Sequence, residues 1–76
     1  MTPGTLLRPY DSAIGATVYL MPVSDAIMGG HIDWLPVEGH EVVLLLAHDT
    51  LSQELMVLVS RQMRIGWTSS DWWTEV

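Results

Sequence analysis

The chain has 76 residues and no cysteine, so it forms one small domain without disulfides or thiolate zinc sites to stabilise it. Its net charge is −6 and its only cations are arginines, a balance that disfavours binding to nucleic-acid phosphates and to anionic membranes. Hydrophobic residues make up 49% of the chain and charged residues only 16%, where about 25% is usual. Part of this apolar excess is expected to stay exposed and to contact a protein partner or a second copy.

Strand-like and turn-like segments alternate in the first half of the chain. Residues 5–8 are predicted to form a first strand, and residues 9–16, with Pro, Asp, Ser and Gly, a loop. The β-branched and aromatic segment 17–21 is predicted to form a second strand that ends at a proline. A second loop is predicted over residues 23–32, and a turn over residues 36–40.

The second half contains the clearest strand, residues 41–48. After it the sequence predicts a hairpin loop over 49–53, a return strand over 54–60, a tight turn at Arg61 and Gln62, and a last long strand over 63–69. Both faces of the first two of these strands are apolar. Strands of this kind are covered on both sides, and a chain of this size cannot build two layers, so we expect another subunit to supply the outer cover. The alternative cover is the loop over 23–32.

A helical pattern competes with the strands at residues 51–65. Thr50 and Gln53 fit a capping box, and apolar residues at helical spacing follow, with a glycine beyond them. The alternative fold is therefore α+β, with a helix at about 51–65. Val57 and Val59 favour a strand, because β-branched side chains are restricted in a helix. We therefore predict an all-β fold for a single domain of residues 1–76.

Several short motifs occur in a familiar order. A Pro-Gly start precedes Leu6, a turn centred on Gly39 precedes an apolar strand, and Gly66-Trp67 follows the strand 56–59. This order resembles the small Src-homology-3-like (SH3-like) barrels of bacterial and bacteriophage proteins. The resemblance implies a five-stranded barrel, with a short 3₁₀ turn at residues 70–73 before the final strand.

The resemblance to eukaryotic signalling modules of the same fold is limited to Tyr10-Asp11, so no peptide-groove residues are carried over. The resemblance implies a fold that most often serves binding or assembly. We therefore expect a non-enzymatic module that self-associates or docks on a larger complex, such as a bacterial or phage particle. Residues 1–8 show no signal-peptide pattern, and the expected location is the cytoplasm or a virion.

Aromatic side chains are the candidate partner-binding residues. They are Tyr10, Tyr19, Trp34, Trp72 and Trp73, which could line a groove for a Pro-rich or other extended segment. Adjacent residues of a strand or turn cannot easily both point into one small core. We therefore expect one of the last two indoles to face outward, and its truncation to weaken association by more than about 1 kcal/mol. In the alternative, Trp34 and Trp67 belong to the core.

Three histidines each have an acid nearby in the sequence: His31, His40 and His48. Imidazole and carboxylate groups suit zinc and similar ions, so metal or small-ligand binding at these turns is the alternative function. The spacing matches no known metal signature, and no cofactor is predicted. The sequence also lacks a Gly-x-Ser-x-Gly elbow, a phosphate loop and any lysine, so we predict no catalytic residue and no enzyme.

Overall fold

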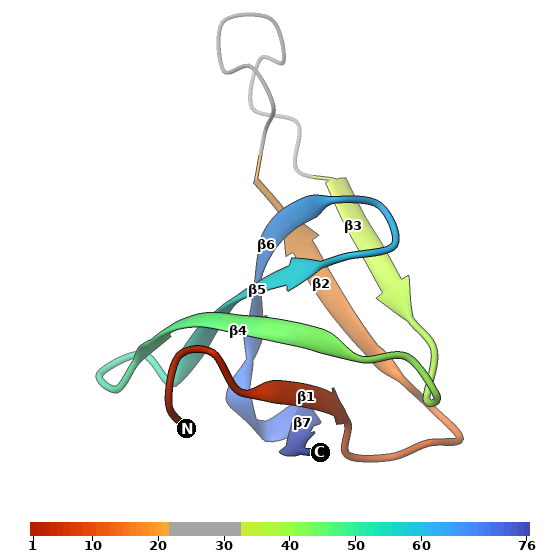
Figure 1. Cartoon of the computed structure of the whole chain (residues 1–76), viewed down its shortest axis with the longest axis horizontal. Helices are drawn as coiled ribbons and strands as arrows, with labels where there is room; N and C mark the ends of the chain where they lie inside the picture. Colours follow the sequence, from red (N-terminus) through yellow and green to blue (C-terminus); the bar gives the residue numbers. More distant parts are fainter. Residues whose placement is uncertain (22–32) are drawn as a thin grey trace, which may run out of the picture.

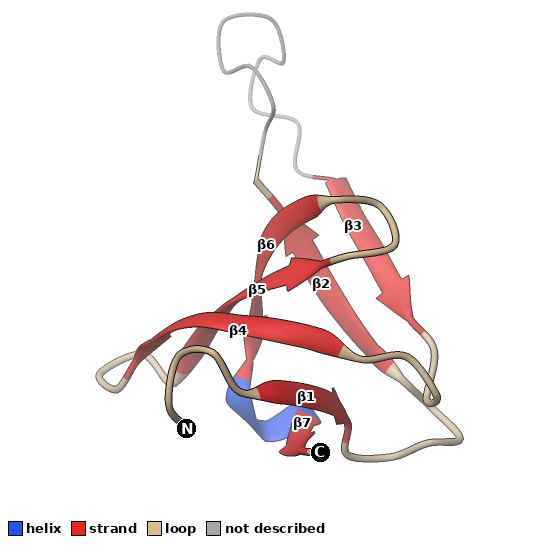
Figure 2. Ribbon diagram, viewed as in Figure 1, coloured by secondary structure: helices blue, strands red, loops and turns tan. Residues whose placement is uncertain are grey.

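The computed structural model describes residues 1–21 and 33–76, and this part of the chain is all-β. Its seven strands form one antiparallel sheet in the order β3-β2-β6-β5-β4-β1-β7 (Figure 1). A 3₁₀ turn, η1, separates the last two strands (Figure 2). The elements are β1 (Leu6–Pro9), β2 (Ala16–Leu20), β3 (Asp33–Val37), β4 (Val43–Asp49), β5 (Glu54–Val59), β6 (Arg64–Ser69), η1 (Ser70–Trp72) and β7 (Trp73–Glu75). The loop predicted over 23–32 lies outside the described residues.

The predicted all-β fold is confirmed, and the alternative helix over residues 51–65 is wrong. In its place β5 pairs with β4 on one side and with β6 on the other. Burial along β5 alternates with a period of two residues, because Leu55, Val57 and Val59 point inward and the residues between them point outward. None of the described residues lies in a helix with the length and apolar character that crossing a bilayer requires.

The strand β3 is missing from the sequence-based prediction, which had only a turn at residues 36–40. Pro36 lies within β3 and lacks the N–H that a central strand would need. The strand is tolerated because β3 lies at one edge of the sheet, where it pairs with β2 alone. The described part of the chain thus has seven strands, where the sequence predicted five.

The core lies on the inner face of the curled sheet. Its apolar members come from every strand except β6: Leu7, Val18, Val37, Val43, Leu45, Leu55, Val57, Val59 and Trp73 are each at most 3% exposed. A β-bulge in β4 shifts the register with β5 between Leu45 and Ala47. Because a bulge bends its strand and increases the local twist, it helps the sheet to curl around this core.

The strands β2 and β6 meet at a position where only glycine fits. A Cβ added to Gly66 would lie 2.5 Å from Cγ1 of Val18 and 2.6 Å from the carbonyl oxygen of Tyr19. Any larger residue would push β2 away from β6. Gly66 therefore allows the β2–β3 hairpin to join the sheet, and this hairpin forms one side of the groove described next.

Candidate binding groove

An open groove of about 370 Å³ lies between the β1–β2 loop, the β2–β3 hairpin and η1. Its principal lining side chains are Tyr10, Asp11, Ile14, Pro36, Asp71 and Trp72. Tyr10 is 74% exposed, Ile14 82% and Trp72 40%. The charged residues among those that line the groove, Asp11 and Asp71, are both acidic. The groove therefore combines exposed apolar surface with negative charge.

The loop that carries Tyr10 and Ile14 is held in shape by Asp11. Its Oδ1 accepts hydrogen bonds from the backbone N–H groups of Ala13 (2.9 Å) and Ile14 (3.4 Å). The backbone N–H of Gly15 also donates to the carbonyl oxygen of Asp11 over 2.8 Å. Gly15 has a φ of +78°, a left-handed conformation that favours glycine. These bonds fix the loop locally, so the groove is preorganised on this side.

The opposite side of the groove is the 3₁₀ turn. It is capped by Ser69, whose Oγ accepts a hydrogen bond from the backbone N–H of Asp71 over 3.4 Å. The two sides are joined directly, because the backbone N–H of Tyr10 donates to the carbonyl oxygen of Trp72 over 2.8 Å. The two aromatic residues of the groove are therefore tied together through their backbones, although they lie at opposite ends of the sequence.

A hydrogen-bonded chain through the core supports the groove from below. The indole Nε1–H of Trp73 donates to Oγ1 of Thr68 over 2.8 Å, and the hydroxyl of Thr68 donates to the carbonyl oxygen of Thr17 over 2.8 Å. Thr17 itself lines the groove. These two hydrogen bonds join β7, β6 and β2. Thr68 is the one polar side chain among the buried residues of the described part.

The predicted partner-binding residues fall into three groups. Tyr10 and Trp72 meet in the groove. Tyr19 and Trp34 lie opposite each other on β2 and β3, 43% and 70% exposed, and do not line it. Trp73 is only 3% exposed. The prediction that one of the two adjacent indoles faces outward is thus confirmed for Trp72, and Trp73 is a core residue that cannot touch a partner in this structure.

Three further groove residues, Ile14, Pro36 and Asp71, and the supporting Thr68 are not among the residues that the sequence predicts for the site. No sequence motif marks the first three, because they come together in the groove only when distant segments of the chain fold against one another. The sequence contains one indirect indication of the role of Thr68. A buried indole N–H needs a hydrogen-bond partner, and a threonine at an inward-facing position of the preceding strand can supply one.

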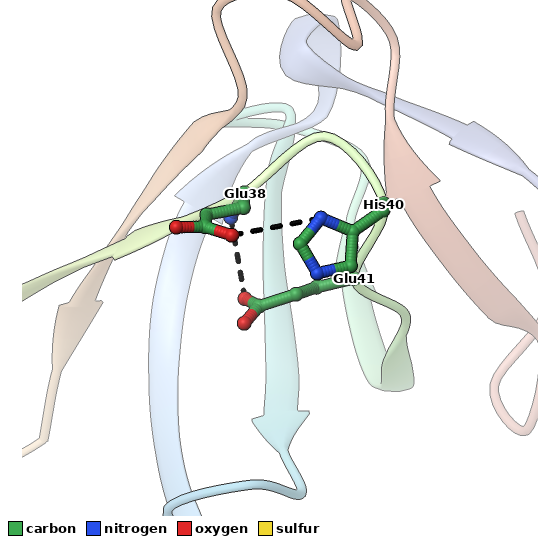
Figure 3. Close-up of side chains that lie close together, drawn as sticks. All are labelled: Glu38, His40 and Glu41. Atoms are coloured by element: carbon green, nitrogen blue, oxygen red, sulfur yellow. Dashed lines mark hydrogen bonds and ion pairs between the residues drawn. The ribbon is translucent and has the colours of Figure 1, made fainter.

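Of the three histidines that have an acid nearby in the sequence, one lies in a cluster with two carboxylates in the structure. His40 lies with Glu38 and Glu41, and their ligand atoms are within 4.8 Å of one another (Figure 3). Nδ1 of His40 is 3.5 Å from Oε2 of Glu38. Glu41 also accepts a hydrogen bond from the backbone N–H of Glu38 over 3.2 Å. The cluster contains neither His48, which lies in β4, nor His31, which lies outside the described residues.

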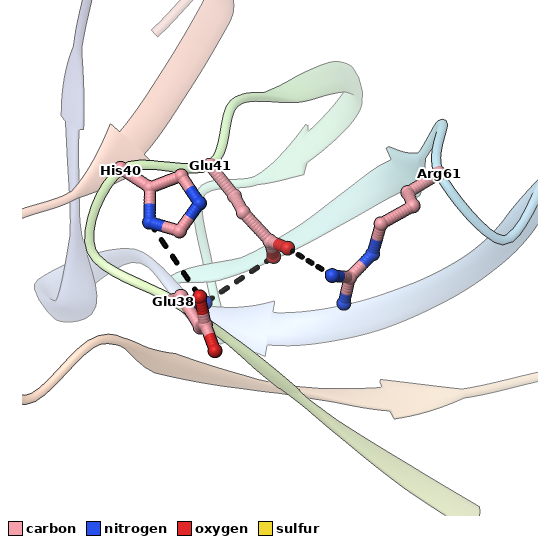
Figure 4. Close-up of polar contacts among 4 residues, drawn as sticks. All are labelled: Glu38, His40, Glu41 and Arg61. Atoms are coloured by element: carbon pink, nitrogen blue, oxygen red, sulfur yellow. Dashed lines mark hydrogen bonds and ion pairs between the residues drawn. The ribbon is translucent and has the colours of Figure 1, made fainter.

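One member of this cluster is already paired with a cation. Oε1 of Glu41 lies 2.7 Å from Nη1 of Arg61, in the turn between β5 and β6 (Figure 4). A metal ion would have to compete with this guanidinium for the most enclosed carboxylate, since the side chain of Glu41 is only 13% exposed. The arrangement therefore resembles a surface ion-pair network more than a preformed metal site.

Comparison of the chain with protein-family models, with curated proteins and with solved structures finds no significant match. The functional assignment therefore depends on the surfaces of the molecule itself.

Proposed function

We propose that this chain is a non-enzymatic interaction module that docks on a larger complex by holding an extended segment of a partner protein in the groove of Tyr10 and Trp72. The observation that carries this proposal is the convergence of three exposed, large apolar side chains on one groove with hydrogen-bonded walls. Exposed aromatic grooves suit extended, proline-containing segments, which lose little conformational entropy when they bind. Preorganised walls reduce the cost of binding further.

The charge of the groove defines the partner segment more closely. Asp11 and Asp71 flank the apolar side chains, and the whole chain carries a net charge of −6. A segment with arginine or lysine beside its apolar residues complements this surface, whereas an acidic segment is repelled. Binding should weaken as salt is added, because exposed charges are screened.

We also assign the chain to the SH3-like barrels, as its sequence suggests. Two features support this assignment: η1 covers residues 70–72 directly before the final strand, and five strands remain in the sheet beside the β2–β3 hairpin, which lies between β1 and β4 in the sequence. On the same resemblance, the larger complex is a bacterial or phage assembly.

The proposal is tested by selecting binders from a library of random dodecapeptides displayed on a surface. We expect the selected peptides to combine proline or other apolar residues with arginine or lysine. Trp72→Ala should weaken their binding at least about tenfold. Leu51→Ala is the matched control, since Leu51 is 96% exposed in the β4–β5 turn and does not line the groove. Failure to enrich any peptide, or enriched peptides that bind Trp72→Ala unchanged, would contradict the proposal.

The alternative function is binding of a divalent metal by Glu38, His40 and Glu41, which is favoured by the closeness of their ligand atoms. Calorimetric titration of the chain with zinc tests it directly. Saturable binding that is lost in His40→Ala would support the alternative. Absence of saturable binding removes it.

A further inference from the structure

The outer face of the sheet carries two parallel rows of apolar side chains. Residues that are paired directly across antiparallel strands project from the same face, so the pairings define the rows. The first row is Leu6, Leu44, Leu58 and Ile65, and the second is Ala47, Met56, Trp67, Tyr19 and Trp34. None of these nine side chains belongs to the buried core. The apolar outer face expected from the two-faced strands is therefore present.

Charged residues border these rows at opposite ends. Beyond the second row, Asp49 pairs with Glu54 on the same face. Beyond the first row comes Arg8, two residues after Leu6 on β1 and therefore also on the outer face. Along the strand direction the outer face therefore carries Arg8 at one end, then the first and second apolar rows, and then Asp49 and Glu54 at the other end.

This order is complementary to itself under a two-fold rotation. Consider an axis that lies between two facing copies, perpendicular to the strands, and passes between the apolar rows. The rotation places the first row of one copy against the second row of the other. It also brings Arg8 of each copy to the end that carries Asp49 and Glu54. A two-fold axis along the strands would instead oppose acid to acid, which is unfavourable.

The size of the face indicates a weak complex. The second row crosses five neighbouring strands, a width of about 19 Å, and Arg8 is separated from the acids by about 20 Å at ordinary strand dimensions. Laid flat, the face would measure about 400 Å² per copy, and because the sheet is curled (Figure 1) two copies can bring only part of it into contact. The contact is therefore less than half of the roughly 800 Å² that a standard stable interface buries per partner. Two copies should associate reversibly and not as an obligate dimer.

We propose that a second copy of this chain packs on the outer face through the two apolar rows, with Arg8 of each copy beside Asp49 and Glu54 of the other. Arg8 has no ion-pair partner among the described residues, whereas Arg61 pairs with Glu41. The loop over 23–32, the alternative cover for this face, lies outside the described part of the chain. The groove of Tyr10 and Trp72 takes no part in this contact, so the two proposals can fail separately.

Sedimentation equilibrium from about 10 µM to about 1 mM tests the proposal, since this range covers weak dissociation constants. We expect a monomer–dimer equilibrium. Leu58→Lys and Ile65→Lys should each abolish the dimer while circular dichroism shows an unchanged fold. Ile14→Lys, which adds the same charge at an 82% exposed position of the β1–β2 loop away from the rows and the acids, and Trp72→Ala should leave the equilibrium unchanged.

Charge reversal tests the orientation of the two copies. Arg8→Glu should weaken the dimer about tenfold or more, because it places acid against acid. Adding Glu54→Arg to Arg8→Glu should restore much of the loss, since each copy then offers a cation to the new acid. A monomer throughout the concentration range, or a dimer that tolerates both lysine variants, would overturn the proposal. A dimer with no rescue by the double reversal would overturn the orientation.

Discussion

The indole of Trp73 and the hydroxyl of Thr68 form a buried hydrogen bond of 2.8 Å that links the last strand to the strand before η1. The same hydroxyl donates to the carbonyl oxygen of Thr17 over 2.8 Å. A hydroxyl has one hydrogen to donate and lone pairs that accept, so one side chain satisfies both partners. This bond satisfies the indole of Trp73 in the core, whereas the neighbouring Trp72 lines the groove.

Thr68→Val should destabilise the fold by about 1 to 3 kcal/mol, because it leaves a buried indole N–H and a carbonyl oxygen without their partner. Thr68→Ser keeps the hydroxyl and is the matched control, with a smaller loss. Urea denaturation of the three proteins measures the difference. Equal stabilities of the valine and serine variants would show that the hydroxyl contributes little.

The two adjacent tryptophans should respond differently to truncation. Trp72→Ala removes a 40% exposed side chain, so the fold should persist while binding of a groove peptide weakens by more than about 1 kcal/mol. Trp73→Ala empties a core position and should cost about 3 to 5 kcal/mol of stability. Thermal denaturation and peptide titration separate the two effects. Unfolding by both substitutions would mean that Trp72 is a core residue as well.

His48 gives a stability prediction in the opposite direction. Its Nε2 is buried and has no hydrogen-bond partner among the described residues, and a buried polar atom in this state is unfavourable. His48→Phe, which keeps a ring of similar shape, should therefore stabilise the fold by about 1 kcal/mol. His40→Phe is the control, because the side chain of His40 is 77% exposed and its replacement should change little. A destabilised His48→Phe variant would show that the nitrogen is satisfied in solution.

Asp49 should make stability depend on pH. The backbone N–H of Leu51, 3.0 Å from its Oδ1, holds the pKa of Asp49 below its usual 3.8, with further contributions from Ser52 and His48. Because the folded state binds this proton less readily than the unfolded state, the contribution of Asp49 is complete above the usual pKa. It is lost as the pH falls from about 4 through the lowered folded pKa.

Asp49→Asn should therefore reduce the fall in unfolding temperature below about pH 4. The comparison is made at low protein concentration, where the chain is a monomer, so that the proposed contact between Asp49 and Arg8 of a second copy does not add to the pH dependence. An unchanged pH profile would contradict the role of this carboxylate.

The strands β4 and β5 could be predicted from sequence because each carries its apolar residues without interruption, and Val57 and Val59 decided against a helix. β3 could not, because Pro36 reads as a turn and only the edge position of the strand makes it acceptable. The groove could be predicted only in part. Tyr10 and Trp72 were candidates, but their contact depends on the pairing of the two ends of the chain. Trp73 is buried in preference to Trp72 because it pairs with the buried Pro9 of β1, and no local pattern connects these two residues.

Nitrogen–proton correlation spectra of the indole N–H groups show directly whether partner segments bind in the groove of Trp72. The chain has four tryptophans, each assigned by its own substitution with phenylalanine, and the probe is the tightest selected dodecapeptide. The spectra are recorded on Leu58→Lys, so that self-association does not move the signals of the outer face. We expect the Trp72 signal to shift saturably while those of Trp34 and Trp73 stay in place. A shift of Trp34 and Trp67 with an unmoved Trp72 would rule out binding in the groove and place the binding site on the outer face of the sheet.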